Sequence, residues 1–225
     1  MSRGAYRQEH PLPAVVLHWL HLVCMVLLTA TGFFIATPLR VPGMTMAAAQ
    51  WLHYVLMYLV LITLAARVYW AFYGSGSSTT RGSRTVERDF RNFAPQAANR
   101  GQLLETLKYY LFLRRTRPVT AKYDTLEKGA YVFWAVLLLL QAYSGFALYG
   151  PTYNWAVLST GTALVGGLGA MRTLHYLIMW VFIVTVVGHV YFTAAENADS
   201  PPLMFWWREK PADDAARLPS EGSDS

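Results

Sequence analysis

Long apolar segments alternate with polar connections along this chain. Residues 14–36, 130–149 and 173–195 contain no Asp, Glu, Lys or Arg, and residues 51–73 contain one such residue, Arg67. Each segment exceeds the about 18 apolar residues that indicate a helix crossing the hydrocarbon core of a bilayer. The pattern therefore predicts an all-α membrane protein with four transmembrane helices.

The basic residues predict how these helices are oriented. Eleven of the nineteen Lys and Arg residues fall within residues 74–128, whereas residues 37–50 contain one and residues 151–170 contain none. Because loops rich in Lys and Arg stay in the cytoplasm, we expect the long middle connection and both termini to be cytoplasmic in a cell-membrane protein. The net charge of +6 therefore reflects membrane topology and contact with lipids, and it predicts no nucleic-acid partner.

Three connecting segments carry patterns of their own. Residues 75–83 are rich in Gly, Ser and Thr, which predicts a flexible connection. Residues 100–117 place leucine and tyrosine at helical spacing among basic residues, which predicts an amphipathic helix on the cytoplasmic surface or one packed on a partner. Residues 156–170 are apolar but too short to span, so we expect an outer segment that packs on a cofactor or a partner.

We expect residues 1–195 to form one domain and residues 196–225 a cytoplasmic tail with a disordered end.

The cysteine content limits the kinds of redox centre that this chain can hold. Cys24 is the sole cysteine, so the chain can form no internal disulfide, no cysteine-ligated iron–sulfur cluster and no covalent haem attachment through C-x-x-C-H. A redox centre would therefore use other ligands, and histidine is the obvious candidate.

Four histidines lie near the ends of the apolar segments: His18, His53, His175 and His189. Fourteen residues separate the last two, which places them on one helix face about 21 Å apart, near opposite edges of a membrane. Two such groups stacked across the membrane suggest electron transfer through haem. Equal depth then predicts His18 with His189 as axial ligands of an inner haem, and His53 with His175 as axial ligands of an outer haem. The plainer interpretation of each is an interfacial histidine bonded to a carbonyl or to water.

Several nearby residues leave alternatives open. His21 lies three residues after His18, so either could ligate the inner haem by spacing, and the other would bond a propionate, a quinone or a carbonyl. Arg67 suits either a lipid phosphate or a haem propionate. Helix packing is the first explanation for Gly32, Gly145 and Gly188, and room for a flat macrocycle is the second. His10 fits an ordinary solvated role.

Five stretches resemble the cytochrome b subunits of membrane-bound nickel–iron hydrogenases. They are His18-Trp19-Leu20 with Thr31-Gly32, Arg67-Val68-Tyr69-Trp70-Ala71-Phe72-Tyr73-Gly74, Tyr109-Tyr110-Leu111-Phe112, Gly145-Phe146-Ala147-Leu148-Tyr149, and the segment from His175 through Trp180 to His189-Val190-Tyr191. The histidine pattern is also similar to that of formate dehydrogenase gamma subunits and thiosulfate reductase cytochromes. In the hydrogenase family the first ligand directly precedes tryptophan, so the resemblance implies His18 rather than His21.

The resemblance implies a four-helix bundle that binds two b haems and anchors an oxidoreductase. Electrons would pass from the iron–sulfur small subunit of a hydrogenase, which works with a nickel–iron large subunit, through both haems to a quinone. His21, Arg67 and Tyr191 are candidate contributors to the quinone site. The chain would be an electron-transfer subunit with no catalytic residues of its own.

Two other functions remain open. The first is a gamma subunit of a formate dehydrogenase or thiosulfate reductase complex with the same electron-transfer role. The second is a haem-free anchor or small transporter whose histidines bind a metal or relay protons.

Overall fold

The computed structural model describes residues 12–37, 43–80, 83–88, 99–115 and 125–196. These residues form six helices and one two-stranded sheet. In chain order the elements are α1 (Leu12–Ala36), α2 (Met46–Tyr73), β1 (Ser75–Thr80), β2 (Ser83–Arg88), α4 (Leu103–Tyr110), α5 (Thr125–Leu148), α6 (Ala156–Leu164) and α7 (Leu168–Glu196). The predicted tail, residues 196–225, lies outside the described residues except for its first residue.

The four predicted membrane helices are confirmed as α1, α2, α5 and α7, each long and apolar enough to cross a membrane. Three of them begin five residues earlier than predicted: α2 at Met46, α5 at Thr125 and α7 at Leu168. Thr45 caps α2, because its hydroxyl accepts a hydrogen bond from the Ala48 amide. Gly167 adopts a φ of +97°, a left-handed conformation that favours glycine, immediately before α7.

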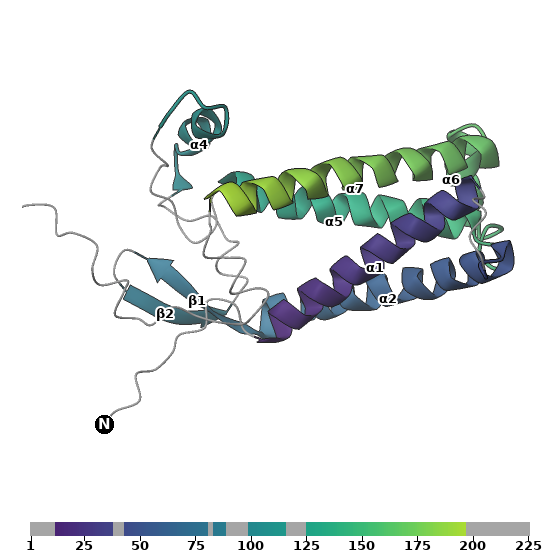
Figure 1. Ribbon diagram of the computed structural model, residues 1–225, viewed down its shortest axis with the longest axis horizontal. Helices are drawn as coiled ribbons and strands as arrows, with labels where there is room; N and C mark the ends of the chain where they lie inside the picture. The colour runs from purple at the N-terminus through teal and green to yellow at the C-terminus, as the bar shows by residue number, and fades with distance from the viewer. Residues whose placement is uncertain (1–11, 38–42, 81–82, 89–98, 116–124, 197–225) are drawn as a thin grey trace, which may run out of the picture.

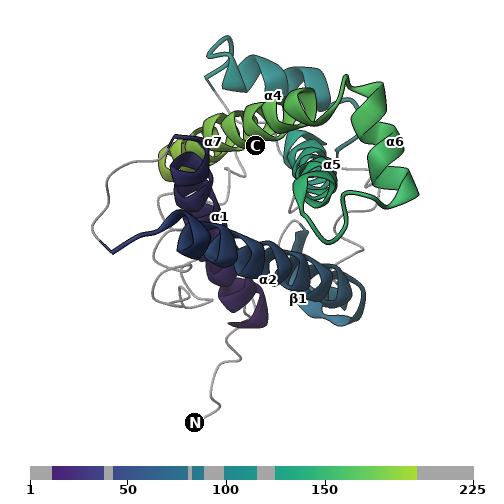
Figure 2. The same ribbon diagram turned by 90° about the vertical axis from the view of Figure 1, so that its right-hand side faces the viewer.

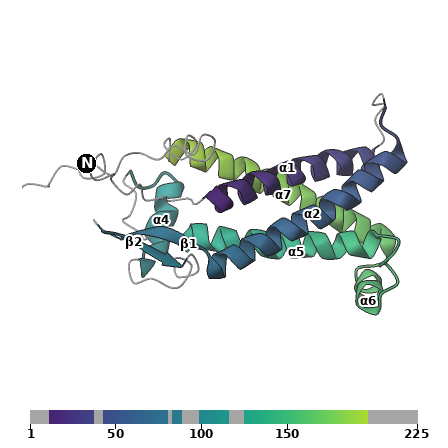
Figure 3. The same ribbon diagram turned by 90° about the horizontal axis from the view of Figure 1, so that it is seen from below.

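The four long helices form two antiparallel pairs. α1 packs on α2 and α5 packs on α7, and all four run along the long axis of the molecule (Figure 1). Figure 2 shows them end-on, arranged around a common axis. We call the end that carries β1, β2 and α4 the α4 end, and the opposite end the α6 end, as Figure 3 also shows.

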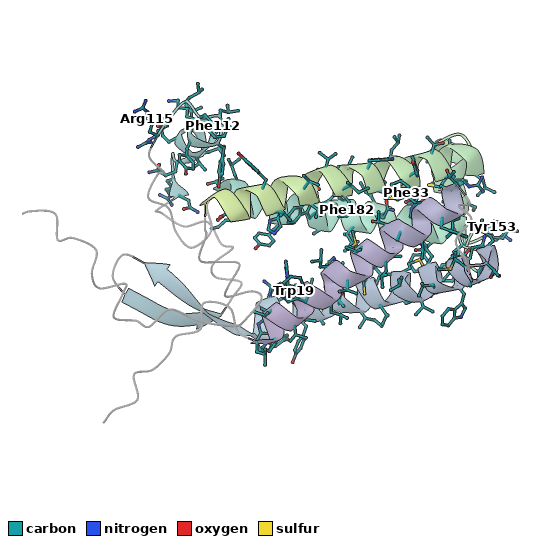
Figure 4. The ribbon with its side chains drawn as sticks, viewed as in Figure 1. Trp19, Phe33, Phe112, Arg115, Tyr153 and Phe182 are labelled. Carbon is teal, nitrogen blue, oxygen red and sulfur yellow. The ribbon has the colours of Figure 1, made fainter. Side chains whose placement is uncertain are left out.

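Apolar contacts join the two pairs in the middle of the bundle. Leu137 and Leu138 of α5 form a buried cluster with Ile178 and Phe182 of α7, and Met25 of α1 packs against it. Figure 4 shows Phe182 on the side of α7 that faces α1. This cluster is called the central apolar cluster below.

Aromatic contacts join the same two pairs at the α6 end. The Phe33 ring of α1 lies edge-on to Trp180 of α7, with ring centroids 5.5 Å apart. Tyr54 of α2 lies against Tyr149, which directly follows α5, at a centroid distance of 4.5 Å. The two helix pairs are therefore linked on both sides at this end.

The distribution of polar and apolar side chains is that of a membrane protein. Hydroxyl-bearing side chains such as Thr31, Thr63 and Ser144 are buried, whereas valines such as Val26 and Val184 are exposed on the long helices. In a bilayer, exposed apolar side chains meet lipid tails, and polar side chains hydrogen-bond between helices. The helices therefore fit a multi-pass membrane protein.

The connection after α2 differs from the sequence prediction. The stretch predicted as flexible, residues 75–83, lies largely in an antiparallel hairpin in which Ser75 pairs with Arg88 and Thr80 pairs with Ser83. The all-α prediction therefore missed one small sheet. Thr79, Thr80 and the neighbouring Thr85-Val86 are β-branched residues, which favour extended backbone, but the abundance of Gly and Ser obscured that signal.

The two short helices agree in part with the sequence. α4 is shorter than predicted because Phe112 adopts a left-handed φ of 59° and ends the helical path. Its exposed Leu103, Leu104 and Leu107 support an amphipathic surface helix. That this helix lies on the cytoplasmic side of the membrane stays a prediction. α6 is too short to span, as predicted, and it packs on α5 and α7 through Leu158.

We expect the local stability of α4 to fall at acidic pH. The pKa of the Glu105 carboxyl lies below its usual value of 4.5, chiefly because Lys108 donates a hydrogen bond to it and also because Arg114 binds it. A lowered folded-state pKa means that these ion pairs stabilise α4 above pH 4.5 and are lost as the pH falls through the lowered pKa. Amide hydrogen exchange, expressed as protection factors, should show α4 protection falling in that range.

Glu105→Gln provides the control for this expectation. The amide side chain does not titrate, so the protection of α4 in this variant should be lower at neutral pH and should not change in the acidic range. An equal acid response in both proteins would contradict a role for the Glu105 ion pairs.

Candidate cofactor site

The four candidate histidines lie at similar depths from the helix ends. His53 and His175 each lie seven residues inside α2 and α7, counted from Met46 and Leu168, at the α6 end. Both are therefore deeper than predicted, because each helix begins earlier than its apolar run. His18 lies six residues after Leu12, where α1 begins, and His189 lies seven residues before Glu196, where α7 ends. Both are therefore at the α4 end. The expected two levels of histidines are present.

The structure brings the rings of His53 and His175 together in an edge-on arrangement. Their ring centroids lie 6.4 Å apart and their planes meet at 66°. A metal–imidazole nitrogen bond is about 2 Å long and the nitrogen lies about 1 Å from the ring centroid, so two imidazoles on opposite sides of one metal have centroids about 6 Å apart. The described residues contain no cluster of three or more His, Cys, Asp and Glu ligands. The pair therefore fits a metal whose other ligands belong to a planar cofactor.

A cavity of about 540 Å³ lies beside this pair between the two helix pairs. Residues of all four long helices line it, and most of them are apolar. Its volume is within the about 300–1,000 Å³ typical of sites for small molecules and cofactors. The cavity therefore has the size and the lining expected for an apolar organic ligand.

Two glycines keep space open next to the imidazoles. A Cβ atom on Gly145 would lie 3.3 Å from Cε1 of His175, and one on Gly32 would lie 3.6 Å from Cε1 of His53. Both glycines line the cavity, whereas a Cβ on Gly188 would meet nothing within 4 Å. Room for a flat macrocycle is the second explanation of these glycines from the sequence, after helix packing. The cavity supports that explanation for Gly32 and Gly145.

The hydroxyl of Thr31 favours one tautomer of His53. Thr31 Oγ1 donates to the carbonyl oxygens of Leu27 and Leu28, at 2.8 and 3.1 Å, and lies 2.8 Å from Nδ1 of His53. A hydroxyl has one proton, so Thr31 accepts a hydrogen bond from Nδ1–H of His53. The neutral imidazole then has its lone pair on Nε2, the form that binds a metal through this atom.

The same arrangement recurs at His175. Ser144 Oγ donates to the Gln141 carbonyl at 3.0 Å and lies 2.8 Å from Nδ1 of His175, so it accepts from Nδ1–H. The side-chain amide of Gln141 donates to Nε2 of His175 at 3.1 Å. The buried Oε1 atom of Gln141 has no partner among the described residues. The α5 helix thus supplies both hydrogen bonds to the imidazole that α7 brings to the cavity.

The second pair of histidines is less closely associated. His18 lies within electrostatic range of His189 and Arg67. The Trp134 ring of α5 lies edge-on to His189 at a centroid distance of 5.1 Å. In the part of the chain that the structure describes, His18 and His189 make no ring contact like that of His53 and His175. The structure therefore places them at one level without bringing them together.

His21 has a hydroxyl partner that the sequence did not suggest. Its Nδ1 atom lies 2.8 Å from Oγ1 of Thr63, which donates to the Val60 carbonyl. Thr63 therefore accepts from Nδ1–H, and His21 is held between α1 and α2. His21 also lies within electrostatic range of His18.

Four residues at this site have no role assigned to them from the sequence: Thr31, Gln141, Ser144 and Arg172. Thr31 appears there only within the Thr31-Gly32 stretch. The three uncharged residues carry no signal in one sequence, because their importance depends on the rotation of their helices. Arg172 does carry a signal, since it lies one helical turn before His175. The sequence prediction leaves it out because the apolar run without charged residues begins at residue 173.

Comparison with known proteins identifies the family of this chain. Residues 9–198 match the family model described as prokaryotic cytochrome b561. The chain is 30% identical to the "Probable Ni/Fe-hydrogenase B-type cytochrome subunit" of Azotobacter vinelandii, over 86% of this chain and 82% of that protein. It is 26% identical to the "Probable Ni/Fe-hydrogenase 1 B-type cytochrome subunit" of Escherichia coli (strain K12), over 82% of this chain and 81% of that protein. The chain therefore belongs to the prokaryotic cytochrome b561 family, together with these Ni/Fe-hydrogenase B-type cytochrome subunits.

Proposed function

We propose that this chain is the b-type cytochrome subunit of a membrane-bound Ni/Fe-hydrogenase and transfers electrons across the membrane. The close pair of His53 and His175 beside the cavity is the observation that carries the proposal. The names of the matched relatives support a hydrogenase over a formate dehydrogenase or thiosulfate reductase as the partner enzyme.

The residues at the α6 end fit haem b as the cofactor. The centroid separation of 6.4 Å suits two imidazoles that would hold one iron, and Gly32 and Gly145 leave the space beside their Cε1 atoms free of Cβ atoms. Haem with two histidine ligands has no open position on iron, so it supplies one-electron transfer and not oxygen chemistry. Thr31 and Ser144 hold both imidazoles in the Nδ1–H tautomer that this ligation requires. Gln141, which donates to Nε2 of His175, would give up this hydrogen bond when iron binds at that atom.

His18 and His189 would hold the second haem at the α4 end. Support comes from their equal depth, from their electrostatic proximity, and from the spacing of His175 and His189 on α7, which corresponds to about 21 Å. Arg67 lies in the same region and could neutralise an anionic group there.

The charge distribution supports a direction for the pathway. Basic residues concentrate in the connection between α2 and α5, which favours a cytoplasmic α4 end and an outward α6 end in the cell membrane. The hydrogenase small subunit, bound to the large subunit, would then deliver electrons at the α6 end, and a quinone would accept them at the α4 end. His21, Arg67 and Tyr191 are the candidate quinone contacts, and unchanged quinone kinetics in all three alanine variants would exclude them.

A haem count tests this function. The purified protein should contain two b haems per chain by the pyridine haemochrome assay, and the complex should reduce quinone when given hydrogen. A protein purified from haem-sufficient cells that contains no haem would overturn the proposal and favour a haem-free anchor or transporter.

We expect Thr31→Val and Ser144→Ala each to weaken binding of the outer haem. Each change removes the acceptor for a ligand Nδ1–H, and loss of such a partner typically costs about 10–100-fold in affinity at metal sites. Haem retention during dilution of the purified variants measures the effect. Thr185→Val is the matched control, because the Thr185 hydroxyl bonds carbonyls of its own helix. Equal retention in all three variants would contradict a role for the hydroxyls.

A further inference from the structure

The cavity beside His53 and His175 is polar at one end and apolar at the other. Gln50 precedes His53 by three residues and Arg172 precedes His175 by three, and both line the cavity on the side toward the α6 end. Residues i and i+3 of a helix lie on neighbouring positions of one face. Leu138 and Phe182, which belong to the central apolar cluster, line the deep end. A ligand that fills the cavity therefore meets polar groups along one edge.

Arg172 gives this polar edge a positive charge. Among the described residues that line the cavity, it is the one with a permanent charge, and none of them is acidic. A charge at the edge of a membrane-spanning bundle is costly unless it is paired or hydrated. The planar guanidinium group can bind a carboxylate through two parallel hydrogen bonds, which a lysine ammonium cannot do. The site therefore suits a flat apolar ligand with carboxylates on one edge.

Haem b has this chemistry, since its macrocycle is apolar and its two propionates project from one edge. We propose that Arg172 binds the propionates of the outer haem and so orients that edge toward the α6 end, with the Gln50 amide as a further donor. This proposal rests on the proposed function. It assigns to α7 two roles within one helical turn, an axial ligand and a counter-charge.

The electrostatic consequence is measurable. A positive group near the haem favours the reduced state, which carries one positive charge fewer than the oxidised state. Loss of the guanidinium group also leaves the propionates unneutralised, which acts in the same direction. Removal of Arg172 should therefore make the outer haem harder to reduce, while the inner haem keeps its potential.

Redox titration of the purified full-length protein tests the assignment. In Arg172→Gln, the ratio of oxidised to reduced outer haem at a fixed applied potential should rise about tenfold, which equals a decrease of about 59 mV for a one-electron couple. Arg172→Lys keeps the charge and should retain most of the wild-type value. Arg115→Gln is the matched control, because Arg115 lies at the α4 end, far from the cavity (Figure 4).

A second measurement applies even if Arg172→Gln is poorly produced. Haem whose propionates are esterified should bind at least tenfold more weakly than haem b to the wild-type apoprotein, and Arg172→Lys should show a smaller difference. If the wild-type protein bound haem b and the esterified haem equally well, the assignment would be overturned.

The remaining outcomes separate the two proposals. An unchanged outer-haem potential in Arg172→Gln would overturn the role of Arg172 while leaving the proposed function intact. If that variant also lost bound anionic lipid, the ligand of Arg172 would be a lipid phosphate. A wild-type protein without haem would overturn the proposed function itself.

Discussion

Replacing His175 by alanine is expected to halve the haem b content of the purified protein, from two haems per chain to one. The imidazole of His175 faces that of His53 across a centroid distance of 6.4 Å, and no other described histidine makes ring contact with either. An iron that lost this ligand would keep one axial histidine and would dissociate more readily. The pyridine haemochrome assay, normalised to protein by quantitative amino-acid analysis, measures the loss.

The partner histidine makes this expectation specific. His53→Ala should lose the same haem, and the double variant should lose no more than either single variant, because both residues act on one iron. His21→Ala is the control, since Thr63 holds His21 away from the outer pair, and this variant should keep the outer haem. Retention of two haems in His175→Ala would show that His53 and His175 are not partners.

Gly145→Leu is expected to exclude the outer haem while leaving the helices formed. Even a single Cβ at this position would lie 3.3 Å from Cε1 of His175, which is tighter than an ordinary contact. The remaining leucine carbons would enter the cavity that Gly145 lines. Leucine is favoured over glycine within a helix by up to about 1 kcal/mol, so loss of helix would not be the cause. Haem content and far-ultraviolet circular dichroism should therefore respond differently.

A graded series sharpens this test. Gly145→Ala should keep part of the outer haem, because the His175 ring needs to move by only a few tenths of an ångström. Gly129→Leu is the matched control in the same helix, where an added Cβ meets nothing within 4 Å. Full haem content in Gly145→Leu would show that the macrocycle does not occupy this cavity.

The membrane architecture could be predicted from the sequence because it depends on one strong signal. Hydrocarbon thickness requires about 20 apolar residues in a row, and four segments meet that requirement. The helix starts were less accurate because capping decides them. Thr45 and Gly167 end the non-helical connections before the apolar runs begin, so His53 and His175 lie deeper than their runs suggested.

The surroundings of the histidines could not be predicted in the same way. Hydrogen bonds from His53 to Thr31 and from His175 to Ser144 join residues on different helices. They depend on how each helix is rotated about its axis, which hydropathy does not encode. The hairpin of β1 and β2 was missed for a related reason, since backbone pairing creates it and its Gly and Ser residues resemble a flexible linker.

The central apolar cluster also bears on how a cell would conserve energy through this protein. Leu137, Leu138, Ile178 and Phe182 are all buried, and they separate the histidine level at the α6 end from the level at the α4 end. None of these side chains can carry a proton or hold a water molecule by hydrogen bonding. If electrons cross between the two levels, as the proposed function requires, the side chains of this cluster offer no route for an accompanying proton. Each such transfer would then move one negative charge across the membrane with no compensating proton. Under the proposed function, electron transfer through this bundle would therefore build up the membrane potential.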